Sequence, residues 1–482
     1  MIDFRPILFI VGLLLATLAV AMTLPALADA VSGHPDWQVF AASAAFTFFI
    51  GMVLILTTRS SKRRINLRQA FVLVAACWLV IPIVGALPFT FALLELDYTD
   101  AFFEAMSGVT TTGATVLVGL DTAPPGILLW RALLQWLGGI GIIAMAITVL
   151  PILGVGGMQL FRMESSDKSE KAMPRMAQVA TFTGLIYLAA TMLCASLYWA
   201  AGMNGFDAVA HAMTTLATGG FSTHDGSVGH FDSALIDTVA VAFMIVGSLP
   251  FVLYLRAVRG APGHLWRDEQ VRLFFTIVAV SVAGMTFYLN IVGGVEVLSA
   301  LRLSAFNVIS VITGTGYATA DFSAWGGFAV AALFCMMFIG GCAGSTTCGL
   351  KIFRFQVLYA AAHIQLRRLL QPNGVFIPYY NGKPIEDSVL ASVMAFFFLF
   401  ILCWVALAVG LGLAGLDFIT AASGAASAIS NVGPGLGPVI GPAGHYADLP
   451  DSAKWLLSAG MLLGRLELFT ILVLLMPSFW RA

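Results

Sequence analysis

The sequence has few charged residues. Asp, Glu, Lys and Arg make up only 10% of its 482 residues, whereas hydrophobic residues make up 59%. Soluble domains carry about 25% charged residues, so the composition excludes an ordinary soluble protein. The chain also has no polar segment long enough to form a separate soluble domain. These absences indicate a protein that crosses a membrane many times.

Cysteine is scarce as well, and catalytic motifs are missing. The six cysteines lie within or beside apolar segments in no metal-ligand spacing, so we expect buried free thiols. Four residues that could serve an enzyme fall close together without an HExxH or GxSxG motif: His211, His224, Asp225 and His230. Ordinary loop histidines explain them better than the alternative function of a membrane-embedded enzyme. A GxGxxG pattern at 410–415 lacks the strand–turn–helix setting of a nucleotide site, so no cofactor is expected in this chain.

Long apolar segments dominate instead. About 20 residues are needed to cross ~30 Å of hydrocarbon. Ten segments reach that length, near residues 6–28, 37–58, 69–93, 124–150, 176–201, 233–257, 271–293, 324–350, 388–412 and 453–478. The first imitates a signal peptide, but its apolar run is longer than a usual signal core and a second segment follows closely. We therefore expect a retained first span.

The basic residues predict the orientation of these segments. Four links hold 18 of the 24 Lys and Arg residues, and we call them the basic links: 59–68, 162–175, 256–272 and 351–383. Acidic residues dominate the opposite loops. By the positive-inside rule both termini face the cytoplasm. The outer acids would concentrate cations at a pore mouth, although ordinary solvated loop charge explains them equally well.

Four short glycine-bearing stretches each lie between two long apolar segments. Their aligned glycines stand 107, 96 and 117 residues apart: Gly113, Gly220, Gly316 and Gly433. Each stretch follows a segment too short to span, and each of these segments begins with a helix-start residue: Asp100, Asp207, Ser299 and Asp417. The pattern predicts half-helices that enter the membrane from outside and return through a glycine-tipped loop. Such backbone persists at membrane depth only where it is buried in protein or lines a water-filled path.

The residue types in these loops favour a monovalent cation. Glycine permits a positive φ, so successive carbonyl groups can turn toward one axis and replace the hydration shell of an ion. The C-terminal ends of the half-helices add negative potential. The side chains are Thr, Gly, Ala, Val and Asn, whereas a divalent-ion site would ordinarily carry carboxylates.

At these residues the chain resembles the membrane subunit of bacterial Trk potassium-uptake systems, within the Trk/Ktr/HKT superfamily. Family-like stretches include WRALLQWLGGIGII (130–143), LGVGGMQ (153–159), NVGPGLGP (431–438) and GRLELFTILVLLMPSFW (464–480). The resemblance implies an all-α polytopic protein of the bacterial inner (plasma) membrane, with four pseudo-symmetric span–pore-loop–span repeats around a central ion pore. The implied units are an N-terminal transmembrane hairpin at 1–68 and pore repeats at 69–161, 162–258, 259–370 and 371–482, the third with a gating loop.

The resemblance also implies a potassium filter made of four loops. Its ion-binding residues would be Thr110, Thr111, Thr112 and Gly113; Ala217, Thr218, Gly219 and Gly220; Thr313, Gly314, Thr315 and Gly316; and Ser430, Asn431, Val432 and Gly433. In the superfamily, Ser in place of the first-loop glycine accompanies sodium transport, so Gly113 implies potassium uptake. Only the third loop approaches the TVGYG sequence of potassium channels. A less selective or ion-coupled K⁺/Na⁺ symporter is therefore the alternative function.

The eighth apolar segment contains a candidate gate. Residues 340–349 include four glycines and three hydroxyl side chains, which weaken a helix midway through the segment. Close helix packing through small residues is one explanation. The resemblance supports the other, an intramembrane gating loop beneath the filter. Its residues would be Gly340, Gly341, Cys342, Ala343, Gly344, Ser345, Thr346 and Thr347.

Arg465 is the second gate candidate. An ionised arginine near the bilayer centre costs at least ~2.5 kcal/mol, so it usually faces a cavity or a partner. Glu467 is only two residues away and would lie on a different helix face. The resemblance implies that Arg465 is an electrostatic barrier below the filter, and a structural ion pair is the alternative. Lys351 either ties the gate to the cytoplasmic surface or is a plain positive-inside residue.

Two further arginines lie in apolar surroundings. We interpret Arg131 and Arg302 as structural residues, paired with acids such as Glu104. The resemblance implies several partners for the chain: K⁺, membrane lipid, a second copy in a homodimer, and a cytoplasmic regulatory subunit with Rossmann-like nucleotide-binding domains. No nucleic acid is expected. The basic links are the candidate docking surface for the regulatory subunit.

Overall fold

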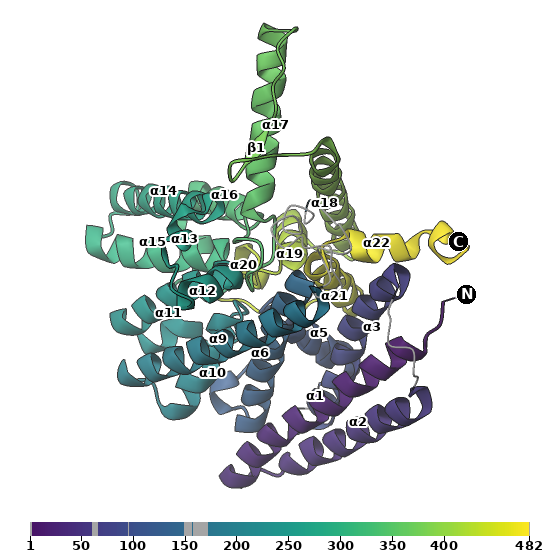
Figure 1. Ribbon diagram of the computed structural model, residues 1–482. Helices are drawn as coiled ribbons and strands as arrows, with labels where there is room; N and C mark the ends of the chain where they lie inside the picture. The colour runs from purple at the N-terminus through teal and green to yellow at the C-terminus, as the bar shows by residue number, and fades with distance from the viewer. Residues whose placement is uncertain (1, 60–65, 95, 149–156, 158–171, 482) are drawn as a thin grey trace.

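The computed structural model shows an almost entirely helical chain, as the sequence predicts (Figure 1). The residues that it describes are 2–59, 66–94, 96–148, 157 and 172–481. Most of the LGVGGMQ stretch and most of the basic link 162–175 lie outside the described residues. In the described part of the chain, the only sheet is a two-stranded antiparallel hairpin.

The described helices account for nine of the ten predicted spans. Seven are long and apolar enough to cross a membrane unbroken, and two further spans are helix pairs bent by 95° and 113°. The exception is the segment 324–350, where the helix ends at Met336 and the glycine-rich residues that follow are not helical. The sequence predicted the interruption of this eighth segment, whereas the bends within the segments 233–257 and 453–478 were not predicted.

An N-terminal hairpin lies at the edge of the molecule (Figure 1). It consists of α1 (Arg5–Ser32) and α2 (Trp37–Thr58). The helices approach closely at Gly12 and Gly51, where a Cβ atom on either glycine would come within 2.8 Å of the carbonyl oxygen of the other. Small residues commonly permit such contacts between membrane helices. Asp29 in α1 also accepts a 2.6 Å hydrogen bond from the backbone N–H of Gly126, which ties the hairpin to the body.

The first two units after the hairpin share one order of elements: a long helix, a half-helix, a loop and a second long segment. The first unit contains α3 (Leu67–Gly85), α4 (Leu87–Phe91), the half-helix α5 (Tyr98–Val109), η1 (Leu120–Thr122) and α6 (Pro125–Thr148). The second contains α9 (Ala172–Ala200), the half-helix α10 (Gly205–Leu216), η3 (Ser227–Phe231), and the bent pair α11 (Ala234–Ser248) and α12 (Phe251–Val258).

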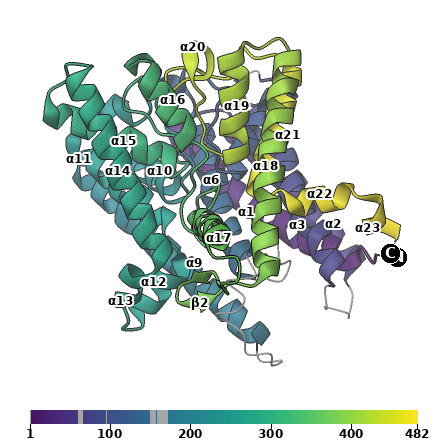
Figure 2. The same cartoon turned by 90° about the horizontal axis from the view of Figure 1, so that it is seen from above.

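The other two units repeat this order with more elaborate ends. The third contains α13 (Gly263–Arg267), α14 (Glu269–Ile291), the half-helix α15 (Val297–Ile312), η4 (Phe322–Trp325) and α16 (Gly327–Met336). The fourth contains α18 (Asp387–Leu413), the half-helix α19 (Phe418–Ser430), α20 (Gly437–Ile440), the bent pair α21 (Asp451–Arg465) and α22 (Phe469–Leu475), and α23 (Pro477–Arg481). Figure 2 shows α18 beside α19 and α21.

One helix projects from the body between the third and fourth units (Figure 1). It is α17 (Ile352–Leu370), and a hairpin of β1 (Tyr379–Tyr380) and β2 (Lys383–Pro384) follows it. This region lies within the basic link 351–383. The projection is therefore built from the basic segment that the sequence places on the cytoplasmic side.

The half-helices begin earlier than the sequence predicts in three of four cases. The residues before their first turns are Asp97, Asn204, Glu296 and Asp417. Asp97 and Asn204 each accept a 2.8 Å hydrogen bond from the backbone N–H three residues later, which belongs to Asp100 or Asp207. The predicted starts Asp100, Asp207 and Ser299 thus lie in the first turn. An acidic residue is favourable there as well, so it imitates a cap in the sequence.

Candidate functional site

The loops after α5, α10, α15 and α19 share one backbone conformation. The aligned glycine has a positive φ in every loop: Gly113 (88°), Gly220 (78°), Gly316 (79°) and Gly433 (108°). The residue two positions earlier is also left-handed in every loop: Thr111 (52°), Thr218 (49°), Gly314 (66°) and Asn431 (53°). Left-handed Thr and Asn residues are uncommon. Their recurrence at one position shows that the surroundings hold all four loops in the same shape.

This alternation decides where the carbonyl groups of each loop point. Along a regular strand, successive carbonyls point to opposite sides. A left-handed residue at every second position reverses the intervening peptide, so that successive carbonyls face the same side. Each loop can therefore present a short ladder of oxygen atoms, which is the arrangement that ion filters use.

The four loops pack against one another in a closed order. A Cβ atom on Gly113 would collide with the carbonyl oxygen of Gly219 in the second loop. The pattern continues around the ring: Gly220 meets the carbonyl oxygen of Thr315, Gly316 meets that of Val432, and Gly433 meets that of Thr112. This cyclic order requires four segments that surround a common axis. We call this arrangement the loop ring.

The hydroxyl side chains of the loop ring bond mainly to one another. Thr110 and Thr112 share a 2.7 Å hydrogen bond between their hydroxyls, and Thr313 and Thr315 share one of 2.8 Å. The side-chain amide of Asn431 donates to the Thr112 hydroxyl (2.9 Å) and thus joins the fourth loop to the first. These hydrogen bonds brace each loop and connect the fourth loop to the first. The loops themselves contain no carboxylate.

Two supporting residues were missed by the sequence reasoning. Gln135 in α6 donates a hydrogen bond from Nε2 to the carbonyl oxygen of Gly219 (2.6 Å). Its Oε1 atom accepts one from the backbone N–H of Phe221 (3.0 Å). The Tyr446 hydroxyl donates to the carbonyl oxygen of Gly433 (2.8 Å). A lone glutamine in an apolar span was a signal for Gln135, because buried polar groups need partners. Tyr446 lies in a loop and gave no such signal.

A buried ion pair supports the segments that follow the first and second loops. The Nε–H group of Arg131 donates a hydrogen bond to Oε1 of Glu104 (2.7 Å), and both side chains are almost completely buried. The same guanidinium donates to the carbonyl oxygen of Ser222 (2.7 Å), and Glu104 accepts the N–H of Val116 (3.0 Å). The prediction that Arg131 pairs with Glu104 is confirmed.

Arg302 has a different set of acids. It donates to Asp237 (2.6 Å) and to Asp232 (3.3 Å), both in the second unit. Glu104 is therefore not its partner. The pair joins α15 to α11, so Arg302 has the structural role that the sequence suggested.

The glycine-rich residues 340–349 form an irregular loop, which we call the inner loop. The N–H of Cys342 donates to the carbonyl oxygen of Ser248 (3.0 Å), and the N–H of Thr346 donates to that of Gly247 (3.1 Å). The N–H of Ala343 donates to the Gln270 side chain (3.0 Å). These bonds replace the helical ones, which explains how non-helical backbone persists inside an apolar segment.

The inner loop touches the loop ring directly. The hydroxyl of Thr218 in the second loop donates to the hydroxyl of Thr346 (3.1 Å), which in turn donates to the carbonyl oxygen of Gly247 (2.9 Å). The cavity beside the inner loop, lined in part by Ser345 and Lys351, has a volume of only ≈ 20 Å³. That space holds about one water molecule.

Arg465 forms hydrogen bonds to the inner loop. It is 1% exposed and lies at the end of α21, where the chain bends by 113°. Its guanidinium donates to the carbonyl oxygen of Thr346 (3.1 Å), the sulfur of Cys348 (2.8 Å) and the carbonyl oxygen of Gly138 (2.9 Å). Among the described residues it forms no ion pair. Within the part of the chain that the structure describes, the alternative of a structural ion pair for Arg465 therefore has no support.

Neighbouring charges are paired or bound to the loop. Glu467 forms an ion pair with Arg354 in α17, which connects the bend after α21 to the projecting helix. Lys351 is 7% exposed and donates to the carbonyl oxygen and, at 3.2 Å, to the hydroxyl of Thr347. This geometry favours a tie to the inner loop over a plain positive-inside residue.

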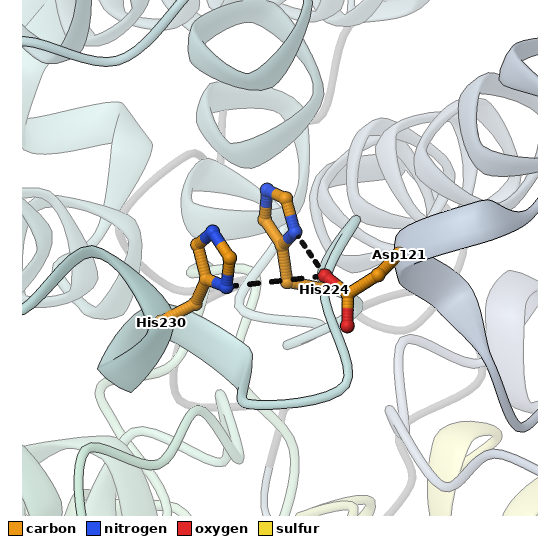
Figure 3. A group of neighbouring side chains, drawn as sticks. All are labelled: Asp121, His224 and His230. Atoms are coloured by element: carbon orange, nitrogen blue, oxygen red, sulfur yellow. Dashed lines mark hydrogen bonds and ion pairs between the residues drawn. The ribbon is translucent and has the colours of Figure 1, made fainter.

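The histidines near the outer loops divide into two groups. His211 is fully buried and bonds to the Ser222 hydroxyl (2.9 Å) and to the backbone of Asp207 (2.9 Å). His224 and His230 instead lie near the surface beside Asp121, a residue that the sequence reasoning did not connect with them (Figure 3). Asp225 accepts hydrogen bonds from the N–H groups of Gly119 and Leu120. It thus joins the segment that follows Gly113 to the segment that follows Gly220, and we call these segments the first and second outer loops.

The helices and loops together define a class of protein: a multi-pass membrane protein with four re-entrant loops around one axis. The chain belongs to the TrkH family, described as cation transport proteins, whose family model matches residues 36–481. This finding confirms the family that the sequence motifs indicated.

Individual relatives match along the whole chain. The Trk system potassium uptake protein TrkI of Halomonas elongata is 46% identical over 477 residues, which cover 99% of this chain and 97% of the relative. The Trk system potassium uptake protein TrkH of Escherichia coli strain K12 is 39% identical, with 99% of each chain covered. The crystal structure of the potassium transporter TrkH from Vibrio parahaemolyticus superimposes with a TM-score of 0.93 at 38% identity, over 100% of both chains.

Proposed function

We propose that this chain is the translocating subunit of a potassium-uptake system and that K⁺ crosses the membrane through the loop ring. The cyclic packing of four loops with the same alternating backbone carries this proposal. Relatives named as potassium uptake proteins support the choice of ion. The membrane potential alone can drive entry, at ~2.3 kcal/mol per charge per 100 mV.

Carbonyl oxygens of the residues before the aligned glycines would bind the ion. These residues are Thr110, Thr111 and Thr112; Ala217, Thr218 and Gly219; Thr313, Gly314 and Thr315; and Ser430, Asn431 and Val432. Their side chains carry no charge, so the ring offers only dipoles to the ion. Dipolar ligands in a ring suit a weakly hydrated monovalent cation that must also leave again.

The inner loop and Arg465 would form the gate. The inner loop lies against Thr218, and Arg465 brings a positive charge to the carbonyl oxygen of Thr346 with no carboxylate partner among the described residues. Opening then requires the inner loop to break its hydrogen bonds to Gly247 and Ser248. The ion pair between Arg354 and Glu467 would link that movement to α17.

Regulation would come from outside this chain. We expect a cytoplasmic, nucleotide-binding regulatory subunit to dock on the basic links, with α17 as the most prominent described part of that surface. We also expect the membrane subunit to form a homodimer, with both termini in the cytoplasm of a bacterial cell. These expectations follow from the family and from the distribution of Lys and Arg.

Gly113→Ser tests the loop ring as a selectivity filter. The added side chain would push against the Gly219 carbonyl oxygen and disturb one ligand position. We expect the ratio of Rb⁺ to Na⁺ flux in proteoliposomes, at a clamped potential, to fall by about tenfold (~1.4 kcal/mol). Gly33→Ser is the matched control, since Gly33 also has a positive φ (75°) but ends α1 with nothing near its Cβ position.

The result separates the two transport functions. An unchanged ratio in Gly113→Ser would remove the first loop from the filter. A wild-type ratio near one would instead favour the less selective K⁺/Na⁺ symporter. A proton or sodium gradient that changes wild-type Rb⁺ flux at constant potential would show ion coupling.

A further inference from the structure

We propose that Asp121, His224 and His230 bind one divalent transition-metal ion of the zinc class on the outer surface, and that this ion ties the first outer loop to the second. The binding site itself does not depend on the transport function. Its effect on ion flux rests on the proposed function of the loop ring.

Two imidazoles and a carboxylate converge at this site (Figure 3). The Nδ1 atom of His224 lies 2.5 Å from Asp121 Oδ1, and the Nδ1 atom of His230 lies 3.9 Å from the same oxygen. One ligand atom from each residue lies within 4.8 Å of the other two. Ligand atoms around a tetrahedral zinc ion are about 3.3 Å apart, given Zn–N and Zn–O bonds of about 2.0–2.2 Å. Side-chain rotations, including a turn of one imidazole, would bring the three ligand atoms to this spacing.

The surroundings hold both rings in place. The His224 and His230 rings stack with centroids 3.6 Å apart and planes within 3°. Phe231 packs edge-on against each ring, at 5.3 Å in both cases. The two Nδ1 atoms thus lie on the same side, next to the carboxylate. Because each nitrogen lone pair lies in its ring plane, one imidazole must turn out of the parallel stack before both can bind one ion.

A second carboxylate orients His224. Its Nε2 atom lies 3.2 Å from Asp207 Oδ2, and Asp207 is itself held by the Thr223 hydroxyl (2.6 Å) and the Asn204 amide (2.7 Å). A metal-binding histidine almost always donates its other N–H to a carboxylate or carbonyl, which leaves the first nitrogen free to bind the metal. His224 lies between the carboxylates of Asp121 and Asp207 and therefore has this arrangement already.

The ligand types select the class of ion. Imidazole nitrogen suits zinc, copper and nickel, whereas calcium and magnesium prefer oxygen ligands alone. Asp121 and His230 are each 45% exposed, so an ion can enter from the outer solvent and keep water as a fourth ligand. The cluster therefore fits a borderline ion such as Zn²⁺ better than the transported alkali ion.

The position of the site explains why an ion there would affect transport. Asp121 follows Gly113 by eight residues, and His224 follows Gly220 by four. Those glycines belong to neighbouring loops of the ring. A bound ion would link the outer ends of both loops and restrict their movement. We expect external Zn²⁺ to lower K⁺ flux.

Metal titration of the purified full chain tests the site directly. With Co²⁺ as a spectroscopic probe and Zn²⁺ as competitor, we expect one ion per chain and binding at least about tenfold weaker in His230→Ala. His445→Ala is the matched control, because His445 is also partly exposed beside an acid, Asp448 at 4.0 Å. Absence of saturable binding, or equal weakening in both variants, would overturn the site.

Flux measurements separate this inference from the proposed function. External Zn²⁺ should reduce Rb⁺ flux in the wild type and in His445→Ala, but not in His230→Ala. If the wild type binds Zn²⁺ at this site and its Rb⁺ flux does not change, the link between the loops is refuted. If no Rb⁺ flux occurs at all, the transport proposal fails, while the titration still decides the metal site.

Discussion

At the aligned glycines of the loop ring, the neighbouring loop leaves room for a hydrogen atom but not for a side chain. At Gly113, Gly220 and Gly316, the position of a Cβ atom is already occupied by a carbonyl oxygen of the neighbouring loop. Their positive φ angles add a second reason, because side chains disfavour that conformation. Close approach between loops, more than flexibility, therefore requires glycine at these positions.

Arg131 and Glu104 show how a charge pair can position a loop. Each is buried, and each also bonds to backbone groups of the outer loops. Removal of one partner from such a pair leaves an uncompensated charge and usually costs about 3–5 kcal/mol. The shape of the first and second loops therefore depends on this buried pair.

Substitutions of Arg465 test its proposed role in gating. Arg465→Ala removes the positive charge and the hydrogen bonds to Thr346 and Gly138, so we expect basal Rb⁺ flux to rise severalfold in proteoliposomes. Arg465→Lys keeps the charge but loses the branched set of donors. A flux near the wild-type value in Arg465→Lys would indicate an electrostatic barrier. Unchanged flux in both variants would exclude Arg465 from the gate.

At the scale of elements, the inner loop is the part most open to test. Thr346→Val removes one hydroxyl that bonds to Gly247 and Thr218 while nearly preserving the side-chain shape. Loss of such bonds costs about 1 kcal/mol each, so we expect a higher basal Rb⁺ flux. Deletion of residues 342–347 should raise the flux further.

Controls separate loosening of the inner loop from general damage. Thr238→Val changes a hydroxyl whose one described bond lies within α11, to the carbonyl oxygen of Ala234, and it should leave flux unchanged. Gel filtration in detergent shows whether each variant is folded. Basal flux equal to that of wild type in folded Thr346→Val and in the deletion would contradict the gate assignment.

At the scale of the whole molecule, the two termini lie close together (Figures 1 and 2). We expect both on the cytoplasmic side, together with the basic links. A membrane-impermeant thiol reagent should then modify Asp448→Cys in intact cells and Lys383→Cys only after the membrane is opened. The parent chain, with its six native cysteines, gives the background. Labelling of Lys383→Cys in intact cells would reverse the orientation.

The number and type of helices were largely predictable from the sequence. Apolar length identified all nine described spans, and glycine clusters marked both the four loops and the break after Met336. Local signals failed at helix starts, since Asp100 and Asp207 lie in the first turn and resemble caps. They also failed at bends, such as the one after Arg465, because neighbouring elements fix the direction of the chain there.

Contacts between distant residues were harder to predict. Asp237 is the partner of Arg302, and Gln135 supports the second loop from α6. The candidate metal site joins Asp121 to His224, which are 103 positions apart in the sequence. Each of these pairs depends on how the units pack, and no periodicity within one segment records that packing.

Apolar length and repeated glycines are local properties of the chain, and they were enough to predict a membrane protein with four glycine-tipped half-helices. The contacts between the loops of the ring, the bond of the inner loop to Thr218 and the lack of a described acid beside Arg465 came from the tertiary structure. The physical reason is that a ring exists only between segments: its order is set by which carbonyl oxygen fills the space beside each glycine, and that neighbour comes from another part of the chain.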